Sequence, residues 1–286
     1  MSLGLYLHIP YCFSKCRYCD FYSHPGERGV PEAYVDALLR ELSRFTPEAP
    51  LQPDTLYFGG GTPSLLRPEQ AKRLIDAACP MPGAEITLEA NPETVTEESL
   101  AGFREAGVNR ISFGVQSARD TQLRTLGRPH TAKQARAAFA AARRAGFANI
   151  SGDIMLALPH YTEAEFDETL ELIEGGGATH ISAYLLKIEP NTVFGGTPSL
   201  LTPAQAARLI RAAGPAPGAE ITLEANPETV TPERLAAFRR AGVNRLSLGI
   251  QTARDDSLAR LGRRHTAAQS RRALGMAVQA GFTDIS

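Results

Sequence analysis

Three of the chain's four cysteines, Cys12, Cys16 and Cys19, lie within eight positions with the spacing C-x3-C-x2-C. A single loop can therefore turn three thiolates toward one centre. Thiolates are soft ligands that suit zinc, copper(I) or iron–sulfur clusters. A four-iron cluster held by only three cysteines leaves one iron open for a further ligand, so this spacing favours a reactive iron–sulfur site.

Three other interpretations of the cysteines stay open. A zinc site needs a fourth ligand, for which His8 or His24 is available, but structural zinc sites usually combine two close cysteine pairs and the chain has no second pair. A disulfide needs an oxidising compartment, and the N-terminal residues do not read as a secretory signal. The third alternative is a purely structural trio of cysteines.

The residues around the cysteines are similar to a known family. A predicted strand ends in His8-Ile9-Pro10, and an aromatic residue, Tyr18, stands directly before the last cysteine. This pattern resembles the radical S-adenosylmethionine (SAM) enzymes, and within them the branch of oxygen-independent coproporphyrinogen III oxidase and the heme chaperone HemW. Oxidase-type proteins tend to carry a further cysteine two residues after the last ligand. This chain has Phe21 there, which is similar to HemW.

The resemblance implies a [4Fe–4S] cluster on Cys12, Cys16 and Cys19, with SAM on the open iron. SAM that receives an electron from a donor can be cleaved to a 5′-deoxyadenosyl radical, and the protein supplies position and electrostatics. The resemblance also implies a chaperone for heme, with heme or a porphyrin as its partner in porphyrin metabolism. An oxidase-type enzyme and a non-catalytic metal-binding module are the alternatives.

Composition indicates a folded globular protein, with 43% hydrophobic and 21% charged residues. The net charge is −1 without a basic stripe, which argues against nucleic acid as a partner. No apolar run approaches the roughly 20 residues that a transmembrane segment needs, so we expect a cytoplasmic protein. Cys79 follows the apolar positions Leu74, Ile75 and Ala78 of a predicted helix, where we expect a small buried hydrophobe.

Short β-rich runs alternate with helical periods along the first two thirds of the chain. Strands are predicted near 4–9, 55–59, 85–91, 110–116, 149–157 and 180–187, and helices near 31–45, 68–79, 97–107, 119–127, 132–146 and 163–175. This alternation predicts an α/β fold with a parallel sheet, and six units indicate a (β/α)6 partial TIM barrel. The functional residues of such folds lie at the C-terminal ends of the strands.

Several residues near those strand ends could bind a ligand. Consecutive glycines, Gly59-Gly60-Gly61, let a ligand approach the backbone closely, although an ordinary βα turn has the same composition. The amide of Gln116 can donate and accept in one pocket, and the planar fork of Arg128 suits a carboxylate. Asp153 lies in an otherwise apolar strand, where an acid without a partner would be costly.

The resemblance assigns these positions to SAM binding, with Arg128 near a second SAM. The implied SAM contacts are Tyr6, Tyr18, Gly60, Gly61, Thr62, Glu89, Gln116, Arg128 and Asp153. His130, His160 and His180 lack the spacing of metal ligands, and we interpret them as structural residues.

The C-terminal third repeats the middle of the chain. Residues 197–286 align with 62–151 without a gap at a constant offset of 135 residues, and about two thirds of the positions are identical. This offset spans several βα units, unlike a solenoid period. Conservative differences, such as Ile111 becoming Leu246, indicate that a segment from a related sequence is joined near 189–196. The origin of this chimera, natural, engineered or mis-assembled, stays open. The copy has no cysteine and therefore cannot hold a second cluster. We predict two parts, a partial barrel over 1–190 and a repeat without the cluster loop over 191–286.

Counting βα units gives a prediction for the architecture. A helix near 203–213 would follow the sixth strand and complete the sixth unit. Strands near 220–226 and 245–251, with helices near 232–242 and 254–281, would then form units seven and eight, and eight is the number that closes a barrel. We therefore expect 245–251 beside 4–9, with Glu224 and Gln251 joining the rim that holds Glu89 and Gln116. The alternatives are a separate half-barrel and an exchange between chains.

Overall fold

The computed structural model describes residues 3–45, 50–156, 158, 162–185, 210, 215–261 and 263–286. The chain forms two compact units, Met1–Ser199 and Leu200–Ser286, and each is described by itself. The join near 189–196 and most of the helix predicted near 203–213 lie outside the described residues.

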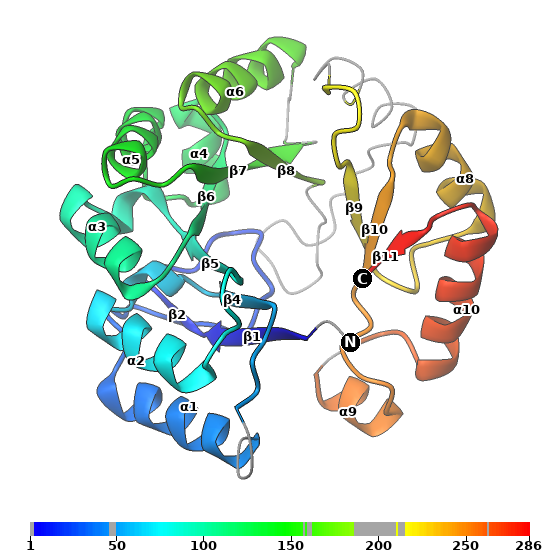
Figure 1. Ribbon diagram of the computed structural model, residues 1–286. Helices are drawn as coiled ribbons and strands as arrows, with labels where there is room; N and C mark the ends of the chain where they lie inside the picture. Colours follow the sequence, from blue (N-terminus) through cyan, green and yellow to red (C-terminus); the bar gives the residue numbers. More distant parts are fainter. Residues whose placement is uncertain are drawn as a thin grey trace. The chain divides into compact units, whose positions relative to one another are not determined.

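A six-stranded parallel sheet forms the centre of the first unit (Figure 1). Its strands pair in chain order: β1 (Gly4–Ile9), β4 (Thr55–Gly60), β5 (Glu85–Ala90), β6 (Arg110–Gln116), β7 (Asn149–Leu156) and β8 (His180–Leu185). The helices of this unit are α1 (Glu32–Phe45), α2 (Pro68–Ala78), α3 (Glu97–Ala106), α4 (Asp120–Leu126), α5 (Ala132–Arg144) and α6 (Glu163–Gly175). The predicted α/β fold with a parallel sheet of six strands is confirmed.

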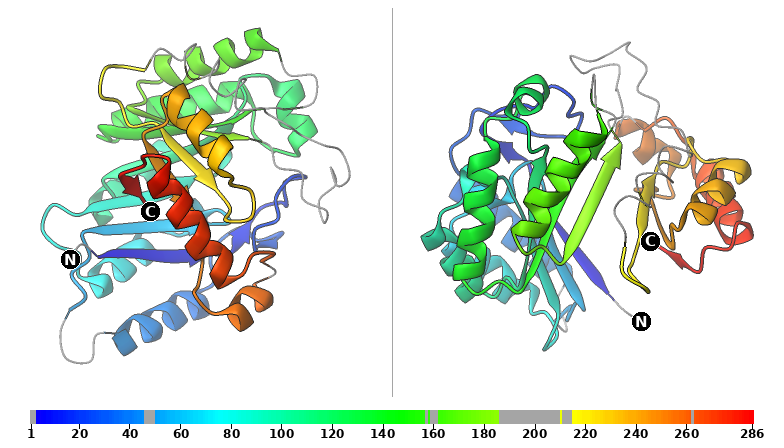
Figure 2. Two further views of the ribbon diagram at one scale, coloured as in Figure 1. Left: turned by 90° about the vertical axis from the view of Figure 1, so that its right-hand side faces the viewer. Right: turned by 90° about the horizontal axis from the view of Figure 1, so that it is seen from above.

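The two faces of this sheet carry different residues because side chains alternate along each strand. Apolar residues in adjacent register, such as Phe58, Leu88 and Ile111, are buried on the outer face, along which the helices run (Figures 1 and 2). The opposite, inner face is polar, and the register places Glu89 beside Ser112 and Asp153 beside Ser182. The inner face is therefore where the first unit can bind a polar ligand.

Local signals explain where the helices begin and end. Thr96, Thr131 and Thr162 each accept a hydrogen bond from the backbone three residues later and form a capping box. Helices α3 and α4 end at Gly107 and Gly127, whose φ angles of 112° and 73° favour glycine.

The second unit contains a three-stranded parallel sheet of β9 (Thr222–Ala225), β10 (Arg245–Leu248) and β11 (Asp284–Ile285). Helices α8 (Pro232–Ala241) and α10 (Ala267–Gln279) cover one face of this sheet, and α9 (Asp255–Arg260) precedes α10 (Figure 1). The predicted helical stretch 254–281 is therefore two helices. The repeat is visible in the register, because Arg245 pairs with Thr222 as Arg110 pairs with Thr87.

The prediction of a closed eight-unit barrel is wrong for the described strands. Residues 245–248 pair with β9 and β11 rather than with β1, which pairs with β4. The physical reason is that the copied strands keep one another as neighbours and share a core that includes Leu235, Phe238 and Leu246. Glu224 and Gln251 belong to this second unit.

The expectation that Cys79 is buried is also wrong. Helix α2 ends at Ala78, and Cys79 is its exposed C-cap with a left-handed backbone at φ 48°. The apolar periodicity therefore stops one residue earlier than predicted. Among the residues that the structure describes, no helix combines the length and the hydropathy needed to cross a bilayer.

Candidate functional site

The three clustered cysteines lie on one loop, which the short parallel pair of β2 (Tyr11–Cys12) and β3 (His24–Pro25) closes. Two backbone hydrogen bonds at the base of the loop, from Gly26 N to Phe13 O and from Glu27 N to Cys12 O, are both 3.1 Å long. The sequence analysis did not predict this strand pair, which is only two residues long on each side. Its effect is to hold the residues that carry the thiols in a compact turn.

The thiols of this loop lie close enough to influence one another. Burial raises the pKa of Cys16 and of Cys19, and the charges of the neighbouring thiols raise both pKa values further. Cationic groups act in the opposite direction, because Arg128 lowers the pKa of Cys16 and Lys15 lowers that of Cys19. Lys15 on the loop and Arg128 after α4 therefore place positive charge near these thiols.

The donor set fits an iron–sulfur cluster better than zinc. Across the described ranges, no three His, Cys, Asp or Glu side chains converge on the position of one metal ion. The cysteines of a four-iron cluster bind different irons, so they need not converge in that way. Both ring nitrogens of His8 already have partners, Tyr6 Oη and Tyr22 O, each at 3.2 Å. His24 Nε2 lies 3.1 Å from Tyr22 Oη.

The cysteine loop is anchored to the end of α4. Arg17 N donates to Leu126 O at 2.9 Å, and the Tyr18 ring packs on a buried cluster that includes Leu126 and Met155. The Tyr18 hydroxyl accepts hydrogen bonds from Arg128 Nε at 3.1 Å and Nη2 at 2.5 Å. Two residues predicted from the sequence, Tyr18 and Arg128, are thus in direct contact.

The glycine loop after β4 lies directly against Cys12. Gly61 N donates to Ile9 O at 2.8 Å. A Cβ atom at Gly61 would lie 2.9 Å from Cys12 Sγ and 2.7 Å from Tyr11 O, so only glycine permits this approach. Thr62 Oγ1 lies 3.6 Å from the same sulfur. The predicted glycine segment therefore has a steric requirement beyond an ordinary turn.

A carboxylate on the inner face is held by two donors. Tyr57 Oη donates to Glu89 Oε1 at 2.8 Å, and Gly60 N donates to Glu89 Oε2 at 3.3 Å. The Tyr57 ring stacks on Tyr6, with 6.0 Å between the ring centroids. Burial raises the pKa of Tyr57, and the negative charge of Glu89 raises it further, so the phenol remains a hydrogen-bond donor. Tyr57 was not among the predicted site residues.

Gln116 ends β6 in a strained conformation. Its φ is 65°, and Ser117 N donates to Val115 O at 2.8 Å across it, which is a γ-turn that few non-glycine residues adopt. Its side chain is buried, and Oε1 has no hydrogen-bond partner among the described residues. Strain and an orphaned buried acceptor together make Gln116 a candidate ligand-binding residue. Gln251 repeats the strain, with φ 64°.

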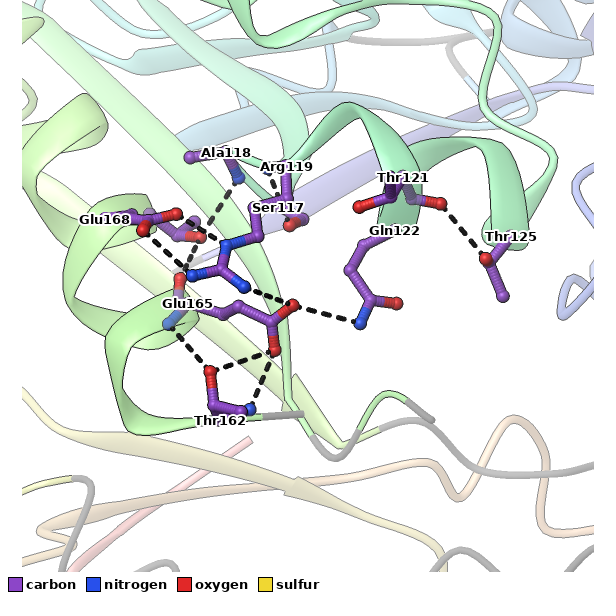
Figure 3. Close-up of polar contacts among 10 residues, drawn as sticks. Ser117, Ala118, Arg119, Thr121, Gln122, Thr125, Thr162, Glu165 and Glu168 are labelled. Atoms are coloured by element: carbon purple, nitrogen blue, oxygen red, sulfur yellow. Dashed lines mark hydrogen bonds and ion pairs between the residues drawn. The ribbon is translucent and has the colours of Figure 1, made fainter. Parts of the chain in front are cut away.

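Contacts to α6 hold the loop that follows Gln116 (Figure 3). Ala118 N donates to Thr169 Oγ1 at 3.0 Å. The guanidinium of Arg119 binds Glu168 through Nε at 2.7 Å and the buried Glu165 through Nη1 at 3.1 Å. Gln122 Nε2 also donates to Glu165, at 3.3 Å. Such surrounding contacts are what a strained turn needs in order to persist.

Asn91 connects the glycine loop with Arg128 and was also missed by the sequence analysis. Its Oδ1 accepts from Arg128 Nη1 at 2.8 Å, and its Nδ2 donates to Thr62 Oγ1 at 3.2 Å. Gly114 leaves room for this contact, since a Cβ there would lie 3.2 Å from Asn91 Oδ1. The available signal was its position at the end of a strand, in Glu89-Ala90-Asn91-Pro92.

Asp153 lies in the middle of β7 on the inner face. Ser112 Oγ donates to Asp153 Oδ1 at 3.0 Å. Burial raises the pKa of this carboxyl group to about 6, although hydrogen bonds from Ser112 and Ser182 oppose the shift. Asp153 and Tyr6 thus lie inside their strands, and the expectation that every candidate follows a strand end is wrong for both.

The histidines set aside as structural differ in their surroundings. His130 is buried, with Nδ1 3.3 Å from Glu93 Oε2 and Nε2 3.1 Å from Val115 O. The repeat preserves this arrangement, because His265 Nδ1 lies 3.1 Å from Glu228 Oε2. His180 is exposed, and His160 lies outside the described residues.

Curated proteins similar to this chain include heme chaperones. This chain is 42% identical over 205 residues to Heme chaperone HemW of Escherichia coli (strain K12), and the alignment covers 70% of this chain and 54% of that protein. This chain is 36% identical over 249 residues to Radical S-adenosyl methionine domain-containing protein 1, mitochondrial, of Bos taurus, and the alignment covers 84% of this chain and 53% of that protein. The chain spans about half the length of these curated relatives.

Solved structures agree in fold. Coproporphyrinogen III oxidase (HemN) from Escherichia coli, described as a radical SAM enzyme, has a TM-score of 0.65 at 26% identity, covering 74% of this chain and 51% of that one. The [FeFe]-hydrogenase maturase HydG has a TM-score of 0.61 at 15% identity, covers 98% of this chain and 69% of that one, and shows the fold alone. The family model of the radical SAM superfamily matches residues 6–173 and 183–286. The chain therefore belongs to the radical SAM superfamily, which implies a [4Fe–4S] cluster and SAM as its cofactors.

Proposed function

We propose that this chain is a HemW-like radical SAM protein that holds its [4Fe–4S] cluster on Cys12, Cys16 and Cys19. One observation carries this proposal: three thiols share one compact loop, and Gly61 of the glycine segment has no room for a side chain beside Cys12. Arg128 lowers the pKa of Cys16 and Lys15 lowers that of Cys19, which opposes the larger effect of burial.

We assign SAM to the inner face beside this loop. SAM carries an ammonium group and a sulfonium group, whose positive charges Glu89 and Asp153 complement. The orphaned amide oxygen of Gln116 offers an acceptor, and Arg128 offers a donor fork for a carboxylate. Tyr6, Tyr18, Gly60, Gly61 and Thr62 complete the proposed set. When bound and reduced, the cluster supplies the electron that cleaves SAM.

The relatives support a role in handling heme. The curated proteins named heme chaperone include those of Escherichia coli and of Bacillus subtilis (strain 168), the latter 39% identical over 196 residues. We therefore propose heme or a porphyrin as the partner, together with an electron donor, in the cytoplasm. The fold similarity to coproporphyrinogen III oxidase supports oxidase-type chemistry as the second candidate.

Anaerobic reconstitution tests this proposal. The reconstituted protein should be brown, should contain iron and sulfide in equal amounts, and should bind heme in a titration followed by its Soret band. Reduced protein is then incubated with SAM, with and without heme, and 5′-deoxyadenosine is measured. Formation of protoporphyrinogen from coproporphyrinogen III would favour the oxidase. A colourless protein that binds zinc in preference to iron would contradict the radical SAM assignment of the site.

A further inference from the structure

We infer that Arg128 directs a hydrogen-bond chain through Asn91 and Thr62 onto the cluster ligand Cys12, and that this chain raises the reduction potential of the cluster. This inference rests on the proposed function. It assigns Arg128, Asn91 and Thr62 a positioning role toward the cluster, in addition to any contact with SAM.

This hydrogen-bond chain has a fixed direction. Arginine is a donor only, so Asn91 must present its carbonyl oxygen to Arg128 Nη1, at 2.8 Å. The amide nitrogen of Asn91 is then left to donate to Thr62 Oγ1, at 3.2 Å. Because the Thr62 oxygen accepts from Asn91, its own proton is available for Cys12 Sγ, at 3.6 Å. Each donor in this chain therefore points toward the sulfur.

The Tyr18 hydroxyl fixes the start of this chain. Its oxygen accepts from two nitrogens of Arg128, at 3.1 Å and 2.5 Å. The guanidinium is therefore held between Tyr18 and Asn91, and its third nitrogen, Nη1, is aimed at the Asn91 oxygen.

Burial strengthens this chain. Thr62 is only 2% exposed, and hydrogen bonds in a low-dielectric interior are stronger and polarise one another. Hydrogen bonds to the ligand sulfurs are among the factors that set the potential of an iron–sulfur cluster. They stabilise the reduced cluster, which carries one more negative charge, more than the oxidised one. The potential therefore rises with each donor.

The test is a redox titration of reconstituted protein without SAM, followed by electron paramagnetic resonance. Thr62→Val should shift the midpoint to a more negative potential, and Asn91→Leu, which removes the donor to Thr62, should shift it in the same direction. Thr62→Ser keeps the hydroxyl and should keep the wild-type potential. Thr125→Val on α4 is the matched control and should also keep it.

A wild-type potential in Thr62→Val would overturn the inference while leaving the proposed cluster intact. If Thr62→Val assembles no cluster, Asn91→Leu decides the inference, since it removes the donor to Thr62 and leaves the hydroxyl in place: a lowered potential supports the chain and an unchanged one refutes it. Failure of the wild type to assemble any cluster would instead refute the proposed function.

Discussion

Tyr57 and Glu89 lie on neighbouring strands, and the Tyr57 hydroxyl donates a 2.8 Å hydrogen bond to the Glu89 carboxylate. The same carboxylate accepts from Gly60 N in the glycine loop that approaches Cys12. One acidic group is therefore oriented by a strand residue and by the loop beside the proposed cluster. This arrangement supports the proposal that Glu89 faces the cationic groups of SAM.

We predict that Tyr57→Phe weakens SAM binding without removing iron. Loss of one hydrogen bond that orients Glu89 corresponds to about 1 kcal/mol, or roughly a fivefold rise in the dissociation constant. Glu89→Gln should weaken binding more, because it removes the charge. Calorimetric titration of reconstituted protein measures both effects. Tyr34→Phe, the same chemical change where the hydroxyl bonds His8 O, is the control. Unchanged affinity in Glu89→Gln would refute the assignment of Glu89.

Gly61→Ala should impair cluster assembly. The new methyl group would meet Cys12 Sγ at 2.9 Å and Tyr11 O at 2.7 Å, so either the glycine loop or the cysteine loop must move. Iron content after reconstitution should fall well below that of the wild type. Gly29→Ala is the control, because its nearest atom would be Leu65 O at 3.9 Å. A full complement of iron in Gly61→Ala would show that the close approach is not required.

Asp153 should make stability depend on pH. Its pKa is raised from 3.8 to about 6 by burial, so between these values the folded state holds a proton that the unfolded state has released. The contribution of Asp153 to stability is therefore largest at low pH and is lost as pH rises through about 6. Asp153→Asn should remove this pH dependence. At pH 8 its free energy of unfolding should exceed that of the wild type by up to about 3 kcal/mol.

Urea unfolding at pH 4.5 and at pH 8 measures this difference for the apoprotein. The free energy of unfolding of Asp153→Asn minus that of the wild type should be larger at pH 8. An equal difference at both pH values would show that the carboxyl group titrates as an exposed acid.

Arg119→Met should destabilise the first unit, because it removes the ion pair between Arg119 and the buried Glu165 carboxylate. The variant keeps most of the aliphatic side chain, so packing changes little. Thermal unfolding measures the effect, and Arg124→Met, at an exposed position on the same helix, is the control. A melting temperature equal to that of the control would mean that the network of Figure 3 contributes little to stability.

The sequence was sufficient to predict what depends on local periodicity. All six strands of the central sheet and the six described α-helices of the first unit were predicted with bounds within a few residues, since apolar periodicity is a local signal. The prediction that 245–251 lies beside 4–9 was wrong, because the choice of neighbour depends on the whole surface that each strand buries. The copied strands retain the register of their originals, as Arg245 with Thr222 shows.

The site was predictable where residue type alone points to chemistry. The cysteines, the glycines and Gln116 stand out in that way. Tyr57 and Asn91 do not, because a tyrosine in a strand and an asparagine before proline have many ordinary uses. Their importance comes from partners on other elements, Glu89 for one and Arg128 for the other. The strain at Gln116 is likewise visible only in the backbone.

The central claim is that Cys12, Cys16 and Cys19 together hold a [4Fe–4S] cluster, and iron analysis of single cysteine variants tests it most directly. Wild-type protein reconstituted without oxygen should bind four irons and four sulfides per chain. Cys16→Ser should lose nearly all of this iron, as should Cys12→Ser and Cys19→Ser, whereas Cys79→Ser at the exposed end of α2 should retain it. Loss of iron in Cys79→Ser, or retention of the full cluster in Cys16→Ser, would contradict the account.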